Sequence, residues 1–101
     1  MITLKRGDNG TGIRATLSNE NGPVDLTGAS VLFLFSNFEI NAQIHDAENG
    51  VVNVFLEKIH TEKTGEFNAE FEVQFADGRV ETFPNNDYLR LKIIKDLGGV
   101  S

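Results

Sequence analysis

The chain alternates between apolar and polar residues with a period of two over much of its length. In residues 66–75, every odd position is apolar and every even position is polar. Successive side chains of a β-strand point to opposite faces, so this segment predicts a strand with one buried and one solvated face. A helix would scatter the same apolar residues around its circumference.

Turn residues divide the rest of the second half into short strands. Asp77-Gly78 lies between this segment and residues 79–83, which predicts a hairpin because Gly adopts the positive φ of a tight turn. Pro84 lacks an N–H donor and suits the end of a strand. A turn at 85–87 and a last strand at 88–94 are expected to follow.

The first half of the chain follows the same rule. Val24 and Leu26 are expected to enter the core, and residues 31–35 are apolar at every position, which indicates a central strand. The polar residues 57–64 are expected to hold one helical turn, with Ile59 as its apolar anchor. The segments predicted in this half are strands at 2–5, 13–17, 31–35, 40–44 and 51–56, a loop at 7–12, a turn at 21–23 and a hairpin closed by Gly50.

Together these segments predict an all-β fold of about seven or eight short strands, with turn signals about every 8–12 residues. No helical pattern of about ten residues or more occurs, which excludes folds that need crossover helices. The prediction is therefore an immunoglobulin-like β-sandwich of two antiparallel sheets packed face to face. We expect one domain over residues 1–97, followed by a tail or linker at 98–101.

Composition narrows the possible functions. The 101 residues include no Cys, so the chain has no disulfide framework, thiolate metal site or cysteine nucleophile. The formal net charge of −6 repels phosphate, so we expect no nucleic-acid partner. The longest apolar run, residues 31–35, is far shorter than the roughly 20 residues of a membrane helix, and no signal peptide is evident. We therefore expect folding in a cytoplasm and no membrane partner.

The titratable residues do not form a pattern typical of catalysis or metal binding. His45 and His60 lack ligand spacing and are expected to be solvated. Asp46, Glu48 and Glu57 match three offsets of a calcium loop, but Gly50 falls one position early, which favours an Asn-Gly hairpin turn.

Carboxylates also gather on one predicted strand. Glu66, Glu70 and Glu72 share the wet face opposite the Phe row, where the burial that would tune a general acid is lacking. No nucleophile, phosphate-loop or dinucleotide motif occurs. We therefore expect no catalytic residue, no metal site and no cofactor, and we expect that the protein is not an enzyme.

Several motifs occur in a distinctive order. They are Ile2-Thr3-Leu4-Lys5-Arg6-Gly7-Asp8, Gly22-Pro23-Val24-Asp25-Leu26-Thr27-Gly28-Ala29, Gly50-Val51-Val52, Thr64-Gly65-Glu66-Phe67, Asp77-Gly78 and Thr82-Phe83-Pro84-Asn85. In this order they resemble the N-terminal domain of the baseplate upper proteins of tailed phages that infect Gram-positive bacteria. The resemblance covers nearly the whole chain.

The resemblance implies a structural role in a phage or prophage tail. Such domains are β-sandwiches that dock receptor-binding or tail-tip parts onto the baseplate, often as trimers, and relatives continue into further domains. The implied location is the virion, after assembly in the bacterial host cytoplasm. Phe38, Phe83 and Tyr88 are the expected interface aromatics, because each lies beside a turn.

A second interpretation is an adhesin-type β-sandwich that binds host cell-wall polysaccharide. Sugar-binding sites usually present Trp or Tyr faces beside polar groups, and this chain has no Trp and one Tyr. A small hydrolase or metalloprotein is a third interpretation, against which the missing motifs argue.

Overall fold

The computed structural model describes residues 1–85 and 87–95. The predicted turn at 85–87 includes residue 86, and the predicted tail at 98–101 lies outside the described residues. The described chain forms ten strands and one 3₁₀ turn. They are β1 Ile2–Lys5, β2 Thr11–Thr16, β3 Ser18–Asn19, β4 Gly22–Pro23, β5 Ser30–Phe35, β6 Phe38–Asp46, β7 Val51–Leu56, η1 Lys58–His60, β8 Gly65–Gln74, β9 Val80–Phe83 and β10 Leu89–Ile94.

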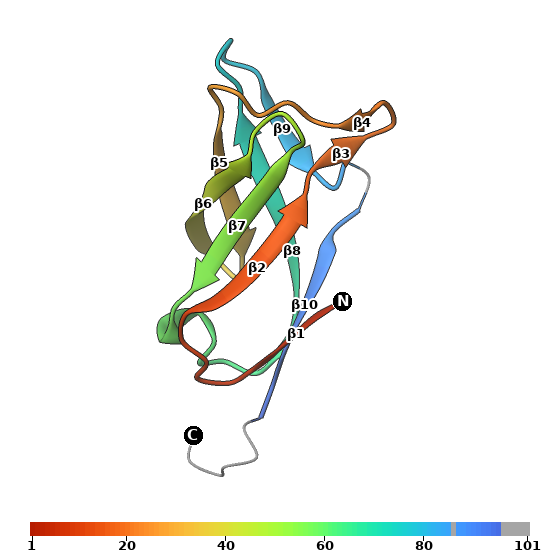
Figure 1. Ribbon diagram of the computed structural model, residues 1–101. Helices are drawn as coiled ribbons and strands as arrows, with labels where there is room; N and C mark the ends of the chain where they lie inside the picture. The colour runs from red at the N-terminus through yellow and green to blue at the C-terminus, as the bar shows by residue number, and fades with distance from the viewer. Residues whose placement is uncertain (86, 96–101) are drawn as a thin grey trace.

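Eight of these strands form one curled sheet, which wraps around the core as a half-barrel (Figure 1). The path runs β1-β10-β8-β5-β6-β7-β2, with β9 paired to β8, while β3 and β4 form a separate two-stranded ribbon. The all-β prediction is confirmed, and within the described residues no helix has the length and apolar character that crossing a bilayer requires.

The predicted sandwich of two separate stacked sheets is not confirmed, because hydrogen bonds join these strands into one continuous sheet. Residues 38–42 of β6 pair with β5, and residues 43–46 pair with β7, with a register shift between Ile44 and Asp46. One long strand therefore belongs to both halves of the fold. The irregularity bends the sheet locally, as bulges do, and lets it fold over its own inner face without a break.

The first and last described strands lie side by side in parallel. Ile2 is opposite Leu91, and the register continues to Lys5 opposite Ile94. The expectation of an entirely antiparallel fold is therefore wrong for this pair. A parallel pair needs a long connection between its strands, and here that connection is the whole intervening chain, so no crossover helix is required.

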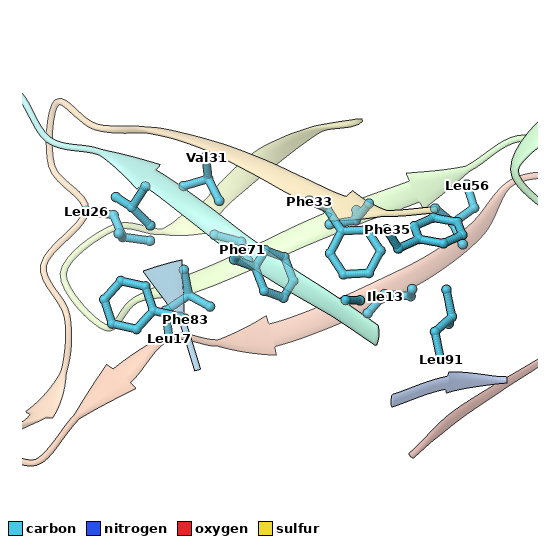
Figure 2. Packing of buried hydrophobic residues seen from close by; sticks show 14 of the residues in the cluster. Ile13, Leu17, Leu26, Val31, Phe33, Phe35, Leu56, Phe71, Phe83 and Leu91 are labelled. Carbon is cyan, nitrogen blue, oxygen red and sulfur yellow. The ribbon is translucent and has the colours of Figure 1, made fainter. Parts of the chain in front are cut away.

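The core fills the concave side of the sheet (Figure 2). Phe33 on β5 and Phe71 on β8 face each other, with ring centroids 4.9 Å apart in a tilted arrangement. Such aromatic pairs add about 0.5–1.5 kcal/mol beyond the area that they bury. The buried apolar residues are Leu4, Ile13, Leu17, Val24, Leu26, Val31, Phe33, Phe35, Val52, Val54, Leu56, Ala69, Phe71, Val73, Phe83, Leu91 and Ile93.

The segment 22–29, the most specific part of the sequence resemblance, connects the β3–β4 ribbon to β5. Val24 and Leu26 are buried, as predicted. Between them Asp25 points outward, and its Oδ1 accepts hydrogen bonds from the Thr27 backbone N–H at 2.9 Å and the Thr27 hydroxyl at 2.6 Å. This local turn orients the two apolar side chains into the core.

Replacing Thr27 with alanine is expected to raise the pKa of Asp25 toward its ordinary value of 3.8. The Thr27 hydroxyl is the largest cause of the lowered pKa, followed by the Thr27 backbone N–H. Because the pKa is lower in the folded chain, these bonds stabilise the fold above the unfolded pKa, and the contribution is lost as pH falls through the folded value. Carboxyl ¹³C titration would measure the change, and an unchanged Asp25 midpoint would contradict this account. Thr82→Ala, on β9 and away from this turn, is the control.

The connection between β7 and β8 contains the predicted helical turn, η1. Its cap is formed by the Glu57 backbone N–H, which donates to Nδ1 of His60 at 2.9 Å.

Ile59 is 59% exposed, so the prediction that it anchors this turn is wrong. The anchor is Thr61, which is fully buried. Its hydroxyl donates to the backbone oxygen of Asp8 at 2.7 Å, and its own carbonyl accepts from the Gly7 N–H.

Replacing Thr61 with valine is expected to lower the free energy of unfolding by about 1–3 kcal/mol. Valine preserves the shape but leaves the partly buried Asp8 carbonyl without its hydroxyl donor. Thr61→Ser keeps the hydroxyl and serves as the control for the lost bond. Urea unfolding measures both variants. A loss in the serine variant with none in the valine variant would show that the methyl group, rather than the hydrogen bond, anchors the turn.

Candidate interaction surface

The two histidines and the hairpin carboxylates do not gather into a chemical site. His45 is exposed on β6, within a strand rather than a turn. His60 is half-buried, and its ring meets Phe38 edge-on with 4.9 Å between centroids, so the expectation that it is solvated is wrong. Among residues 1–85 and 87–95, no group of three His, Asp or Glu side chains is placed to hold a metal ion.

A hollow of about 520 Å³ opens on the outer face of β5, β6 and β8. Its apolar lining is Leu34, Phe35 and Phe38, and the turn residues Ser36 and Asn37 also line it. That turn joins β5 directly to β6, and both of its residues adopt positive φ, as a two-residue hairpin requires. The polar lining comes from Glu39, Asn68, Glu70 and Glu72, and Tyr88 completes it.

The strand register places these side chains in rows across the sheet. Leu34 is opposite Glu39 on β6 and opposite Glu70 on β8. In the next row, Leu32 is opposite Asn41 and Glu72. Directly opposed residues of antiparallel strands share a face and lie close together. The result is a stripe of two half-buried leucines, with carboxylates on both sides of Leu34 and a carboxylate and an amide beside Leu32.

These carboxylates have no cationic partner among the described residues. Within that part of the chain, the one ion pair joins Arg79 Nε to Asp77 at 2.8 Å, in the β8–β9 hairpin. There the Arg79 backbone N–H, and then its side chain, hold the pKa of Asp77 below its ordinary value. The outer face therefore carries carboxylates that form no ion pair among the described residues, although Arg90 and Lys92 of β10 lie opposite Asn68 and Glu66 of β8.

Of the three aromatic residues predicted to be exposed, only Tyr88 is. It is 52% exposed and lines the hollow beside Glu70. Phe38 is opposite Phe35 on the inner side of the sheet, with 5.4 Å between ring centroids, and is therefore partly buried. Phe83 is 2% exposed, because it is opposite Phe71 on the core face of β9. Its predicted exposure is wrong.

One exposed aromatic residue was not predicted. Phe55 on β7 is 49% exposed and lies opposite Gly12, where an added Cβ would come within 3.2 Å of its ring. Beside it, Arg14 Nε donates to Asn53 Oδ1 at 2.9 Å. The alternation along β7 could have revealed this, since the buried positions are Val52, Val54 and Leu56. Residue 55 then falls on the outer face.

This architecture defines a small all-β module whose polar groups lie on an open sheet face rather than in an enclosed cleft. Among solved structures, it is similar to the "N-terminal domain of phage TP901-1 ORF48", with a TM-score of 0.74 and 19% sequence identity. The match covers 94% of this chain and 85% of that chain. No protein-family model and no curated protein sequence matches the chain. The resemblance predicted from the motifs is thus confirmed at the level of the fold.

Proposed function

We propose that the chain is a non-enzymatic structural module of a phage or prophage tail baseplate, which docks onto other tail proteins. The observation that carries this proposal is the fold shared with a phage N-terminal domain over 94% of the chain. The order of the motifs along the sequence, including residues 22–29 and 82–85, supports the same assignment. The open sheet face with its leucine stripe is a surface suited to binding rather than to chemistry.

The proposed role extends to the assembly in which the module works. Docking uses the outer face of β5, β6 and β8, where Tyr88 is the exposed aromatic residue. Aromatic residues are enriched in protein interfaces, because they bury a large area at low entropic cost. The module is further proposed to act in the virion, to assemble in the host cytoplasm and to associate as a trimer, which is what the sequence resemblance implies.

Co-expression with the structural tail proteins encoded beside this chain's gene tests the proposal. We expect one of them to co-purify in fixed stoichiometry and to co-elute in size exclusion with light scattering. An unrelated β-sandwich carrying the same tag is the control for retention on the resin. Absence of any complex, together with a monomeric mass, would contradict the docking role.

Polysaccharide binding is the second candidate, and one observation favours it. Tyr88 lines the same hollow as the amides of Asn37 and Asn68 and the carboxylate of Glu70. An aromatic ring can stack on a sugar ring, and these polar groups can bind its hydroxyls. Titration with host cell-wall polysaccharide separates this function from docking. Saturable binding that is lost in Tyr88→Ala would support it and would argue against the tail-docking role of this face.

A further inference from the structure

The central strand β5 is apolar on both of its faces, as strands buried on both faces are. Only one of these faces is covered by the core. Phe33 and Phe35 are buried in the core, whereas Leu32 and Leu34 lie half-buried on the opposite face. An antiparallel sheet with one face toward water normally alternates apolar with polar residues, and continuous apolar runs are typical of strands buried on both faces. On this face, the neighbours of the two leucines are side chains of β6 and β8 rather than another described layer.

The charges around the leucines indicate what would cover them. Glu39 and Glu70 flank Leu34, and Glu72 flanks Leu32. Glu70 and Glu72 share one face of β8, about 6.7 Å apart along the strand, so their like charges repel each other. Arg90, which is exposed on β10, is one row away opposite Asn68 and forms no ion pair with these glutamates.

We propose that this face docks a segment of a partner protein that carries arginine or lysine together with apolar side chains. The inference rests on the proposed docking function and specifies the chemistry of the partner. Apolar side chains would cover Leu32 and Leu34, while the cations would reach the flanking glutamates in charge-assisted hydrogen bonds. A guanidinium beside Tyr88 could also stack on its exposed ring.

A synthetic seven-residue peptide that alternates arginine and leucine tests this chemistry against the intact 101-residue chain. We expect saturable binding that weakens as salt concentration rises. The same peptide with serine in place of leucine is expected to bind about fivefold more weakly or worse, and a glutamate–leucine peptide is expected not to bind. Amide chemical shifts are expected to move at residues 32, 34, 70, 72 and 88.

Two double variants with the same change in net charge locate the site. Glu70→Gln/Glu72→Gln is expected to weaken binding of the arginine–leucine peptide about fivefold or more. Glu48→Gln/Glu62→Gln, at exposed positions outside the hollow, is expected to leave it within about twofold. Equal losses in the two double variants, or equal affinity for the serine peptide, would overturn the proposal by showing unspecific charge attraction.

These experiments distinguish a failure of the docking function from a failure of the proposed surface. If a tail protein is captured in co-expression and binds Glu70→Gln/Glu72→Gln as tightly as the parent chain, docking stands and this surface is wrong. If the peptide binds as described but no tail protein is captured, the surface chemistry stands and the phage role is wrong. Tyr88-dependent binding of polysaccharide in place of the peptide would overturn the surface proposal directly.

Discussion

Replacing Gly50 with alanine is expected to lower the free energy of unfolding by about 2–5 kcal/mol. Gly50 is buried with φ of +69°, and an added Cβ would lie 2.5 Å from the backbone oxygen of Leu17 and 2.8 Å from that of Val24. Both obstacles are backbone atoms, so no side-chain rotation relieves the clash. The Gly50 carbonyl also accepts the Leu17 N–H at 2.8 Å. Three segments therefore meet at this residue, and a shift in one disturbs the others.

Gly78→Ala is the matched control for this variant. Gly78 has φ of +91°, but no atom lies within 4 Å of the position that a Cβ would take. It therefore carries the conformational cost of positive φ, about 1–2 kcal/mol, without the clash. Urea unfolding of both variants would measure the difference. Losses of similar size would show that the close approach at Gly50 is relieved by movement of the backbone.

Replacing Phe71 with alanine is expected to lower the free energy of unfolding by about 3–5 kcal/mol, through lost burial and the cavity left behind. Phe71 is 1% exposed and lies opposite Phe33 on β5 and Phe83 on β9. Domains of this size are stable by only about 5–15 kcal/mol, so the variant is expected to be partly unfolded at elevated temperature. Phe33→Ala removes the other ring of the pair, and their double variant would measure how strongly the two rings are coupled.

Phe55→Ala is the control for the Phe71 variant. Both substitutions remove a phenyl ring from a strand, but Phe55 is 49% exposed on the outer face of β7. Its loss is expected to cost less than about 1.5 kcal/mol, because much of the ring is in water already. Thermal unfolding followed by circular dichroism compares the two. If Phe55→Ala cost as much as Phe71→Ala, the assigned core would be wrong.

The strands of this fold could be predicted from the sequence where one face of the strand is buried and the other is exposed to solvent. The prediction at 66–75 is confirmed as β8, and the predicted last strand is β10, where Leu91 and Ile93 are buried at alternate positions. The sharing of β6 between β5 and β7 could not be predicted. Its alternating pattern is the same in both halves, and which partner each half takes depends on contacts far away in the sequence.

Prediction failed in two places. In one, the residue that anchors a turn is polar rather than apolar. In the other, a residue next to a turn was expected to be exposed. Ile59 was expected to hold its turn because it is apolar, but a hydrogen-bonded Thr61 does so. Phe83 is next to a turn and yet faces the core, because its register on β9 decides its side.

The candidate surface was only partly visible in the sequence. Residues 31–35 were recognised as apolar on both faces, which led to the expectation of a central strand. That Leu32 and Leu34 face outward between glutamates depends on the register with two other strands. Tyr88 joins them because it precedes β10, which pairs with β8. Such register is set by long-range pairing and turn geometry rather than by local pattern.

The parallel pairing of β1 with β10 determines how the module responds to tension. Ile2 lies at one end of the pair and Lys95 just beyond the other, and the Arg6 N–H extends the pairing by donating to the Ile94 oxygen. A force that draws Ile2 and Lys95 apart therefore slides the two strands along each other. All the hydrogen bonds between them share that load at once, whereas a peeling force would break them one by one. Traction between these two residues thus loads the β1–β10 pair in shear rather than in peeling.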